Sequence, residues 1–138
     1  LIWTDAKEHK YIEESGTMNL MVNIGGTIIT PLAGDTILSG ITRDTVLKIA
    51  RDWGMKVEER NLSVDEVMAA LHAGTLLEVF GTGTAVTICH ISHFGYQGKT
   101  YELPAIENRD FSNKVNDHLA NIRKGSEKDK FGWIEKVG

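Results

Sequence analysis

Apolar and polar side chains alternate along several stretches of the chain, and this period of two predicts β-strands. Residues 17–24 show the clearest alternation, with apolar side chains on one face. Gly25-Gly26 follows directly, and because paired glycines suit a tight turn, a hairpin with residues 27–30 is expected. Further strands are expected at residues 1–3, 11–14, 55–60, 76–79, 85–91 and 100–103, with a second hairpin turn at residues 95–98.

The apolar spacing changes to that of an α-helix in three places. In the first helix, Thr42 is expected to be the N-cap, and Gly54 is expected to end the helix. The second helix starts with Ser63 and Glu66, which have the spacing of a capping box, and it ends near Gly74. The third runs from about residue 111 to residue 124. This order of elements predicts an α/β or α+β fold, with a mixed sheet and helices packed outside it. The side chains expected to face inward from the helices are Val46, Leu47, Ile49, Ala50, Trp53, Val64, Val67, Met68, Leu71, Val115, Leu119 and Ile122.

Composition excludes several classes of protein. The 138 residues suffice for one domain with a real core, and 41% hydrophobic with 25% charged residues is typical of a soluble globular chain. A net charge of −4 without a dense basic block argues against a nucleic-acid partner. Cys89 is the only cysteine, so an internal disulfide is excluded. No apolar run is long enough to span a bilayer, so no membrane association and a cytoplasmic location are expected.

The five histidines do not have a metal-binding spacing, and no metal site is expected. His90 and His93 lie three residues apart in a strand and its exit, so they point to opposite faces of the sheet. The chain also opens on Leu1-Ile2-Trp3 without a Met or a polar lead, from which we expect a fragment of a longer protein.

Two segments are suited to an anion. Residues 80–85 (Phe-Gly-Thr-Gly-Thr-Ala) lie between apolar runs, and they offer backbone N–H groups and hydroxyls with little side-chain bulk. Residues 40–42 (Gly-Ile-Thr) open a helix, whose first N–H groups attract phosphate. The simpler readings are a tight loop with positive φ at Gly81 or Gly83, and a Thr42 that only caps its helix. Together the segments indicate a phosphate-bearing ligand, without choosing among nucleotide, sugar phosphate and cofactor.

Five motifs occur in an order that resembles a known family. They are Glu14-Ser15-Gly16-Thr17-Met18-Asn19, then residues 36–44 (Thr-Ile-Leu-Ser-Gly-Ile-Thr-Arg-Asp), Glu59-Arg60, residues 78–85 and Gly132-Trp133. Together they resemble the C-terminal, cofactor-binding part of branched-chain amino-acid aminotransferases, of the fold type IV pyridoxal-phosphate class. The resemblance spans nearly the whole chain, and it implies a mixed sheet or pseudo-barrel flanked by helices.

The resemblance also implies roles for individual residues. Glu14 would pair with the protonated pyridine nitrogen of pyridoxal 5'-phosphate and keep the ring cationic, so that it accepts electrons. Leu38 would lie against one face of the ring. The phosphate would be held by Gly40, Ile41, Thr42 and Thr84, and the substrate would be met by Thr17, Thr84 and Ala85.

Other positions depart from the family pattern. Ser39 stands where the family has proline, and His90 stands where a proline usually follows. Val86 and Cys89 occupy the places of a thiol pair found in mammalian members, so a redox switch is not expected. The family's Schiff-base lysine belongs to a segment upstream of this chain, and Lys7 and Lys10 stand in the wrong context to replace it. The chain alone is therefore expected to have no catalytic residue and no activity.

The expected parent enzyme exchanges amino groups between leucine, isoleucine or valine and 2-oxoglutarate, as a homodimer. Three alternatives stay open at this point. They are a D-amino-acid aminotransferase, an aminodeoxychorismate lyase, and a non-catalytic module that binds a phosphorylated ligand.

Overall fold

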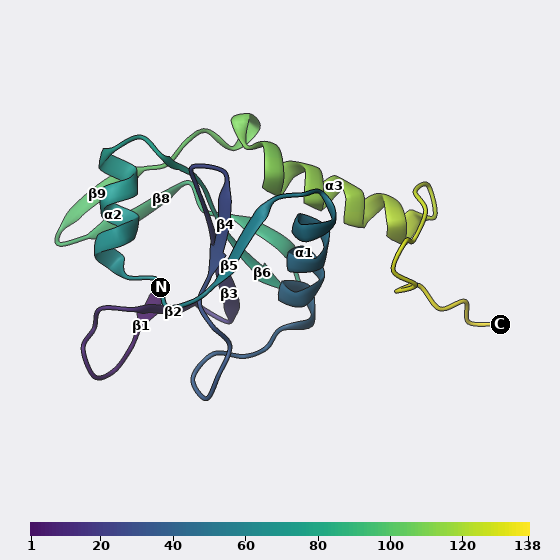
Figure 1. The fold of residues 1–138 in the computed structure, drawn as a ribbon, viewed down its shortest axis with the longest axis horizontal. Coiled ribbons are helices and arrows are strands. Elements are labelled where there is room, and N and C mark those ends of the chain that lie inside the picture. Colours follow the sequence, from purple (N-terminus) through teal and green to yellow (C-terminus); the bar gives the residue numbers. More distant parts are fainter.

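A computed structural model describes all residues from 1 to 138 and shows a mixed sheet with helices on both of its faces (Figure 1). Seven strands form the main sheet, and two more form a separate hairpin. None of the helices has the length and apolar composition needed to cross a membrane. The strands are β1 (Ile2–Thr4), β2 (Ile12–Ser15), β3 (Met18–Ile24), β4 (Thr27–Thr30), β5 (Lys56–Glu59), β6 (Leu76–Gly83), β7 (Thr87–His90), β8 (His93–Tyr96) and β9 (Lys99–Glu102); the helices are α1 (Ile41–Asp52), α2 (Val64–His72), a short 3-10 turn (Ile106–Asn108) and α3 (Asp110–Lys124).

The central strand is β3, which pairs with three others. Strand β2 pairs with its first residues and β4 with its last ones, while β6 runs along the length of β3. All neighbours are antiparallel except β4 and β5, which α1 connects as a parallel pair. The expected mixed sheet with helices outside it is confirmed, and so is the first hairpin. The second hairpin is present, but its first strand is β8 and only Gln97 and Gly98 form its turn, whereas the sequence predicts the turn at residues 95–98 after a strand at 85–91. The turn of the first hairpin needs its glycines, because Gly25 and Gly26 both have positive φ (57° and 89°).

The alternating pattern of β3 separates two cores. Met21 faces the helices α1 and α3, and Leu20 and Val22 face α2 and the β8–β9 hairpin. Figure 1 shows α1 and α3 together on one side of the sheet, with α2 near β8 and β9 on the other. Each apolar row of the sheet is therefore covered by a different set of elements.

Helix boundaries agree with the sequence in most places. Ser63 Oγ accepts the Glu66 N–H at 3.1 Å, which confirms one half of the capping box. Glu66 does not complete the other half, because its carboxylate binds Arg60. Gly54 and Gly74 follow the ends of α1 and α2 with positive φ, as a helix stop requires.

Two local predictions are wrong. Gly40, not Thr42, is the N-cap of α1, and the helix already includes Ile41. Gly81 and Gly83 do not have positive φ, because β6 continues through both of them. Both errors have one cause: the polar and small residues of these segments extend regular elements instead of interrupting them.

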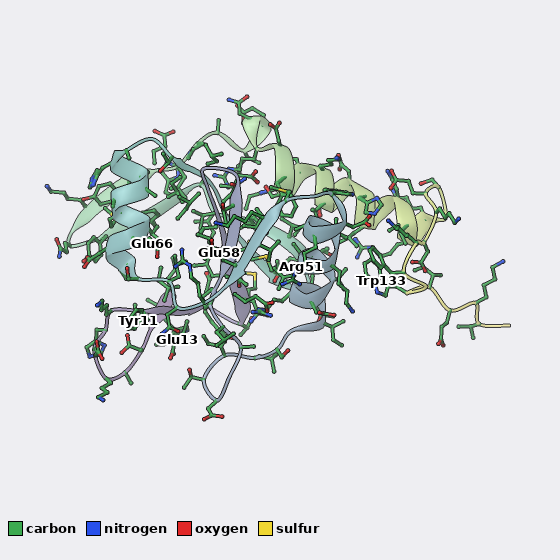
Figure 2. All side chains as sticks on the ribbon, in the orientation of Figure 1. Tyr11, Glu13, Arg51, Glu58, Glu66 and Trp133 are labelled. Atoms are coloured by element: carbon green, nitrogen blue, oxygen red, sulfur yellow. The ribbon has the colours of Figure 1, made fainter.

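The C-terminal tail folds back on the body, as expected. Phe131 and Trp133 stack with ring centroids 4.6 Å apart and pack against the α1–α3 core. Figure 2 shows Trp133 beside the end of α3, with the last residues extending away from the body.

Candidate functional site

Three connecting segments lie at the same end of the central strands. The β2–β3 turn (residues 16–17) precedes Met18, and the β6–β7 turn (residues 84–86) follows Gly83. Because Asn19 lies opposite Thr82 in the antiparallel β3–β6 pair, these two turns are neighbours. The start of α1 joins them there through Gly40, which lies against the side chain of Asn19.

A hydrogen-bond network joins the expected ring-binding acid to the loop before α1. Glu14 Oε1 accepts the backbone N–H of Leu38 at 3.0 Å and the side-chain amide of Asn19 at 3.3 Å. The same Asn19 nitrogen donates to the Leu38 carbonyl at 2.7 Å. Both backbone groups of Leu38 are thus held, while its side chain stays 73% exposed and Glu14 Oε2 has no hydrogen-bond partner.

The first turn of α1 is open to a ligand. No side chain caps the helix at Gly40, so the N–H groups of Ile41 and Thr42 have no intrahelical partner. The macrodipole adds partial positive charge at this point. Arg43 fixes the position of the turn, because its guanidinium is buried and donates to the Pro31 carbonyl at 3.0 Å.

The second anion-suited segment differs from the expected loop. Its first residues belong to β6, and only residues 84–86 form the turn, with Thr84 and Ala85 exposed. Gly81 and Gly83 are small because Met18 lies over them: a Cβ would meet the Met18 side chain at 3.0 Å and 3.3 Å respectively. The hydroxyl of Thr82 is buried and has no hydrogen-bond partner.

The structure therefore brings the expected cofactor residues to one end of the sheet. Glu14, Leu38 and Gly40 are connected through Asn19, and Thr42 is the second residue of the helix that Gly40 caps. Thr17, Thr84 and Ala85 are exposed in the two adjacent turns.

Sequence reasoning missed two buried polar residues at this end, Asn19 and Thr82. The available signal was their place in strands: residues i and i+2 face the same side of a sheet, so Asn19 shares its face with Met21 and Thr82 shares its face with Phe80. Glu14 and Asn19 form a cross-strand pair, and Asn19 and Thr82 form the next one.

Ion pairs account for the Glu59-Arg60 motif. Glu59 binds Arg43 at 3.0 Å and Arg51 at 2.7 Å, so it ties β5 to α1. Partial burial alone would raise the pKa of Glu59, but hydrogen bonds from Arg51 and Arg43 outweigh burial and hold that pKa below its usual value. Arg60 binds Glu58 and Glu66, which raise the pKa of its guanidinium. Figure 2 shows Glu58, Glu66 and Arg51 spread along this part of the molecule.

A cavity of about 710 Å³ lies away from this site. It lies on the opposite face of β3, beneath α2 and the β8–β9 hairpin, and 14 of its 19 lining residues are hydrophobic. A phosphate needs donors and positive charge, so this hollow does not suit the ligand that the loops predict. Cys89 lines the hollow as a free thiol.

The histidines do not add a metal centre to the site. No group of three or more His, Cys, Asp or Glu side chains gathers closely enough to hold a metal ion. Burial and the charge of Arg109 hold the pKa of His90 below its usual value, against the opposing effect of Glu78. His90 Nδ1 lies 3.4 Å from Ser112 Oγ, so its polar contact is with α3.

Comparison with known proteins identifies the family. The sequence model of the amino-transferase class IV family matches residues 3–94, and the chain belongs to this family. Branched-chain-amino-acid aminotransferase 2 of Bacillus subtilis (strain 168) is 40% identical over 137 residues, which are 99% of this chain and 38% of that protein.

Solved structures agree on the fold. A branched-chain aminotransferase of Thermoproteus uzoniensis, solved with norvaline, superposes with a TM-score of 0.76 at 27% identity, over 97% of this chain and 40% of that one. An aminotransferase of Brucella abortus bound to the cofactor PLP gives a TM-score of 0.64 at 26% identity, over 86% of this chain and 37% of that one. The chain thus spans about 38% of the length of the curated relatives that it matches.

Proposed function

We propose that the chain is the C-terminal, cofactor-binding domain of a branched-chain amino-acid aminotransferase and that it holds pyridoxal 5'-phosphate at the loop end of β3 and β6. The observation that carries this proposal is the Glu14–Asn19–Leu38 network beside the uncapped start of α1. It combines an acid, an exposed apolar side chain and a phosphate-suited helix end, which are the three groups that this cofactor needs.

The residues present fit the cofactor. Glu14 Oε2 is free to accept a hydrogen bond from a protonated ring nitrogen, and the exposed side chain of Leu38 offers an apolar contact for one face of the ring. The amides of Ile41 and Thr42 lack partners, as an anion site requires. The hydroxyl of Thr82, at the same end of the sheet, is also buried without a hydrogen-bond partner within the chain.

Pyridoxal phosphate, when bound, supplies a ring that accepts electrons released at the amino-acid α-carbon. The chain's own residues orient that ring. Glu14 holds the ring nitrogen in its protonated form, and Leu38 excludes water from one face. Ile41, Thr42 and Thr84 bind the phosphate, while Thr17 and Ala85 lie beside the place of the substrate.

A binding experiment tests the cofactor site. Pyridoxamine 5'-phosphate is the best probe, because it presents the same ring and phosphate and needs no covalent bond to a lysine. We expect the chain to bind it in calorimetry more tightly than inorganic phosphate or adenosine monophosphate. Equal binding of all three would favour a non-catalytic module that accepts any phosphate, and it would contradict the proposal.

Two pairs of variants assign the binding. Glu14→Gln should weaken pyridoxamine 5'-phosphate binding about tenfold, the effect of losing one charge-assisted hydrogen bond. Glu13→Gln is the matched control, since Glu13 is its neighbour but accepts only from Thr36. Thr42→Val should weaken the same binding, whereas Thr100→Val on exposed β9 should not.

Transamination needs more than this chain contains. The proton moved at the α-carbon requires a positioned amine. Lys7 and Lys10 lie in the exposed loop before β2, whereas the proposed site lies at the other end of that strand, at Glu14 and the β2–β3 turn. Incubation with leucine, 2-oxoglutarate and pyridoxal phosphate should therefore give no glutamate above a no-protein control. Measurable turnover would show that the chain is catalytic by itself.

The finer parts of the proposal concern the parent enzyme. Its substrates would be leucine, isoleucine and valine with 2-oxoglutarate, and it would act as a homodimer in the cytoplasm. The names of the relatives support the branched-chain substrates. Within the same family, a D-amino-acid aminotransferase or an aminodeoxychorismate lyase is the competing assignment. Assay of the parent with L-leucine, D-alanine and aminodeoxychorismate separates the three.

A further inference from the structure

Asn19 occupies the centre of the candidate site, although none of its atoms is needed to touch the ligand. Its side chain is buried, with 5% of the residue exposed. The amide nitrogen donates to Glu14 Oε1 and to the Leu38 carbonyl, so both of its N–H groups are used. Those two acceptors also fix which end of the amide is nitrogen, and they leave Oδ1 pointing elsewhere.

The oxygen end of Asn19 lies against the start of α1. A Cβ built on Gly40 would be only 2.3 Å from Asn19 Oδ1, while the next atom of another residue, the Cβ of Arg43, would be 3.6 Å away. The backbone of Gly40 has φ −67° and ψ 139°, which any residue adopts. Glycine is therefore required here for space alone, and the atom that requires it belongs to Asn19.

These contacts connect the two ends of the proposed cofactor site. The amide nitrogen of Asn19 donates to Glu14, the acid proposed for the ring nitrogen. The amide oxygen lies against Gly40, the N-cap position of the helix proposed to bind the phosphate. Leu38, which would support the ring face, is held between them by both of its backbone groups. A shift of Asn19 changes all three positions at once.

We propose that Asn19 is a positioning residue that couples the ring-binding acid Glu14 to the phosphate-binding start of α1, with Gly40 as the residue that makes room for it. This inference rests on the proposed function, because it assigns the coupling to a pyridoxal-phosphate site. It goes further in stating that the ring end and the phosphate end depend on each other through one buried amide.

The decisive experiment is a double-variant cycle on the 138-residue chain. Gly40→Ala should push Asn19 away and weaken pyridoxamine 5'-phosphate binding at least tenfold. Gly34→Ala is the matched control, since a Cβ there has no atom within 4 Å and the glycine has no positive φ. Asn19→Ser should weaken binding by a similar factor, because Glu14 and Leu38 lose their shared donor.

The double variant separates coupling from general damage. With Asn19→Ser present, the atom that Gly40→Ala would strike is gone, so the added alanine should cost little further affinity. The losses are then strongly non-additive, as expected for residues in direct contact. Additive losses in the cycle would overturn the inference, and so would a Gly40→Ala variant that binds like the wild type.

A second readout does not depend on the cofactor. The Leu38 amide donates to Glu14, so its hydrogen exchange should be slow in the wild type and in Gly34→Ala. It should become at least tenfold faster in Asn19→Ser and in Gly40→Ala. If the wild type binds no pyridoxamine 5'-phosphate, the proposed function fails and exchange at Leu38 alone decides the coupling; unchanged exchange in both variants would refute it.

Discussion

The guanidinium of Arg109 is 1% exposed and donates hydrogen bonds to three backbone carbonyls. It reaches Pro104 at 2.8 and 2.9 Å, Val79 at 3.0 Å and Ile91 at 2.7 Å. Burial lowers the pKa of Arg109, and the nearby Glu78 opposes that shift. Through this one side chain, β6 and the segments after β7 and β9 are held to the start of α3.

Replacing Arg109 with Met should destabilise the fold. Methionine fills much of the same space but leaves the Pro104 and Ile91 carbonyls without donors and the Val79 carbonyl with only the Ile91 N–H. This predicts a loss of about 3 kcal/mol in the free energy of unfolding. Urea denaturation measures the loss. Arg123→Met is the matched control, because Arg123 is exposed and makes one hydrogen bond, to Thr87; we expect a change of about 0.5 kcal/mol or less there. Equal effects of the two variants would contradict this role.

Residue types alone could indicate only the members of the site that are not fully buried. Glu14, Leu38 and Thr42 could be singled out because their motifs stand next to turns and a helix start. Asn19 and Arg109 could not, since an isolated polar residue in a sequence gives no sign of the backbone groups that it meets after folding. Burial of a polar group becomes favourable only through those tertiary partners.

Among the secondary-structure elements, strand β5 is joined to helix α1 by the side chain of Glu59. Its carboxylate is shared by Arg43, which is buried, and Arg51, which is half exposed. The two ion pairs connect β5, which is parallel to β4, with the helix α1 that precedes it in the chain. It therefore holds the N-terminal and C-terminal turns of α1 on the same strand.

Glu59→Gln should reduce stability in a pH-dependent way. The native pKa lies below the ordinary value of 4.5, so the carboxylate contributes its stabilisation above pH 4.5 and loses it as pH falls through the native pKa. We expect a loss of about 1.5 kcal/mol at pH 7 that shrinks below pH 4.5. Urea denaturation at pH 7 and at pH 3.5 measures both values. A constant difference between wild type and variant across that window would exclude the ion pair as the cause.

Most elements could be predicted from the sequence, because their periodicity agrees with their final burial. The hairpin at Gly25-Gly26 and the Ser63 cap depend on local chemistry, and both are confirmed. The end of β6 could not be predicted, since two glycines in a strand normally indicate a turn. Their place in the strand depends on Met18, which lies 63 and 65 residues earlier and whose side chain occupies the space that they leave.

The whole molecule is closed on one side by its C-terminal tail. Trp133 and Phe131 pack on the α1–α3 core, and Lys130 binds Asp52 at the end of α1. Lys114 adds a cation over the ring of Trp53, 4.1 Å from its centroid. The tail thus covers the joint between two helices that are far apart in sequence.

Removing the aromatic contact should loosen this joint. Trp133→Ala should lower the free energy of unfolding by about 2 kcal/mol, less than for a fully buried tryptophan because Trp133 is only partly buried. Val137→Ala is the control, since Val137 is 97% exposed and should have no effect. Thermal unfolding followed by circular dichroism compares the two. A Trp133→Ala variant as stable as the control would show that the tail merely rests on the surface.

Fold class could be predicted at this scale, whereas the division into two cores could not. Alternation in β3 indicates one apolar face, whereas β3 is buried on both faces and even Asn19 and Asn23 are buried. The cover of the second face depends on the crossover through α1 and on the return of α3. Those are long-range contacts, and single-residue patterns carry no information about them.

The contact between Gly40 and Asn19 limits how this sequence can drift. A larger residue at position 40 meets an occupied space, whereas a smaller residue at position 19 opens that space first. Either change alone weakens the site, but a chain that has already changed position 19 accepts a larger residue at position 40 at little further cost.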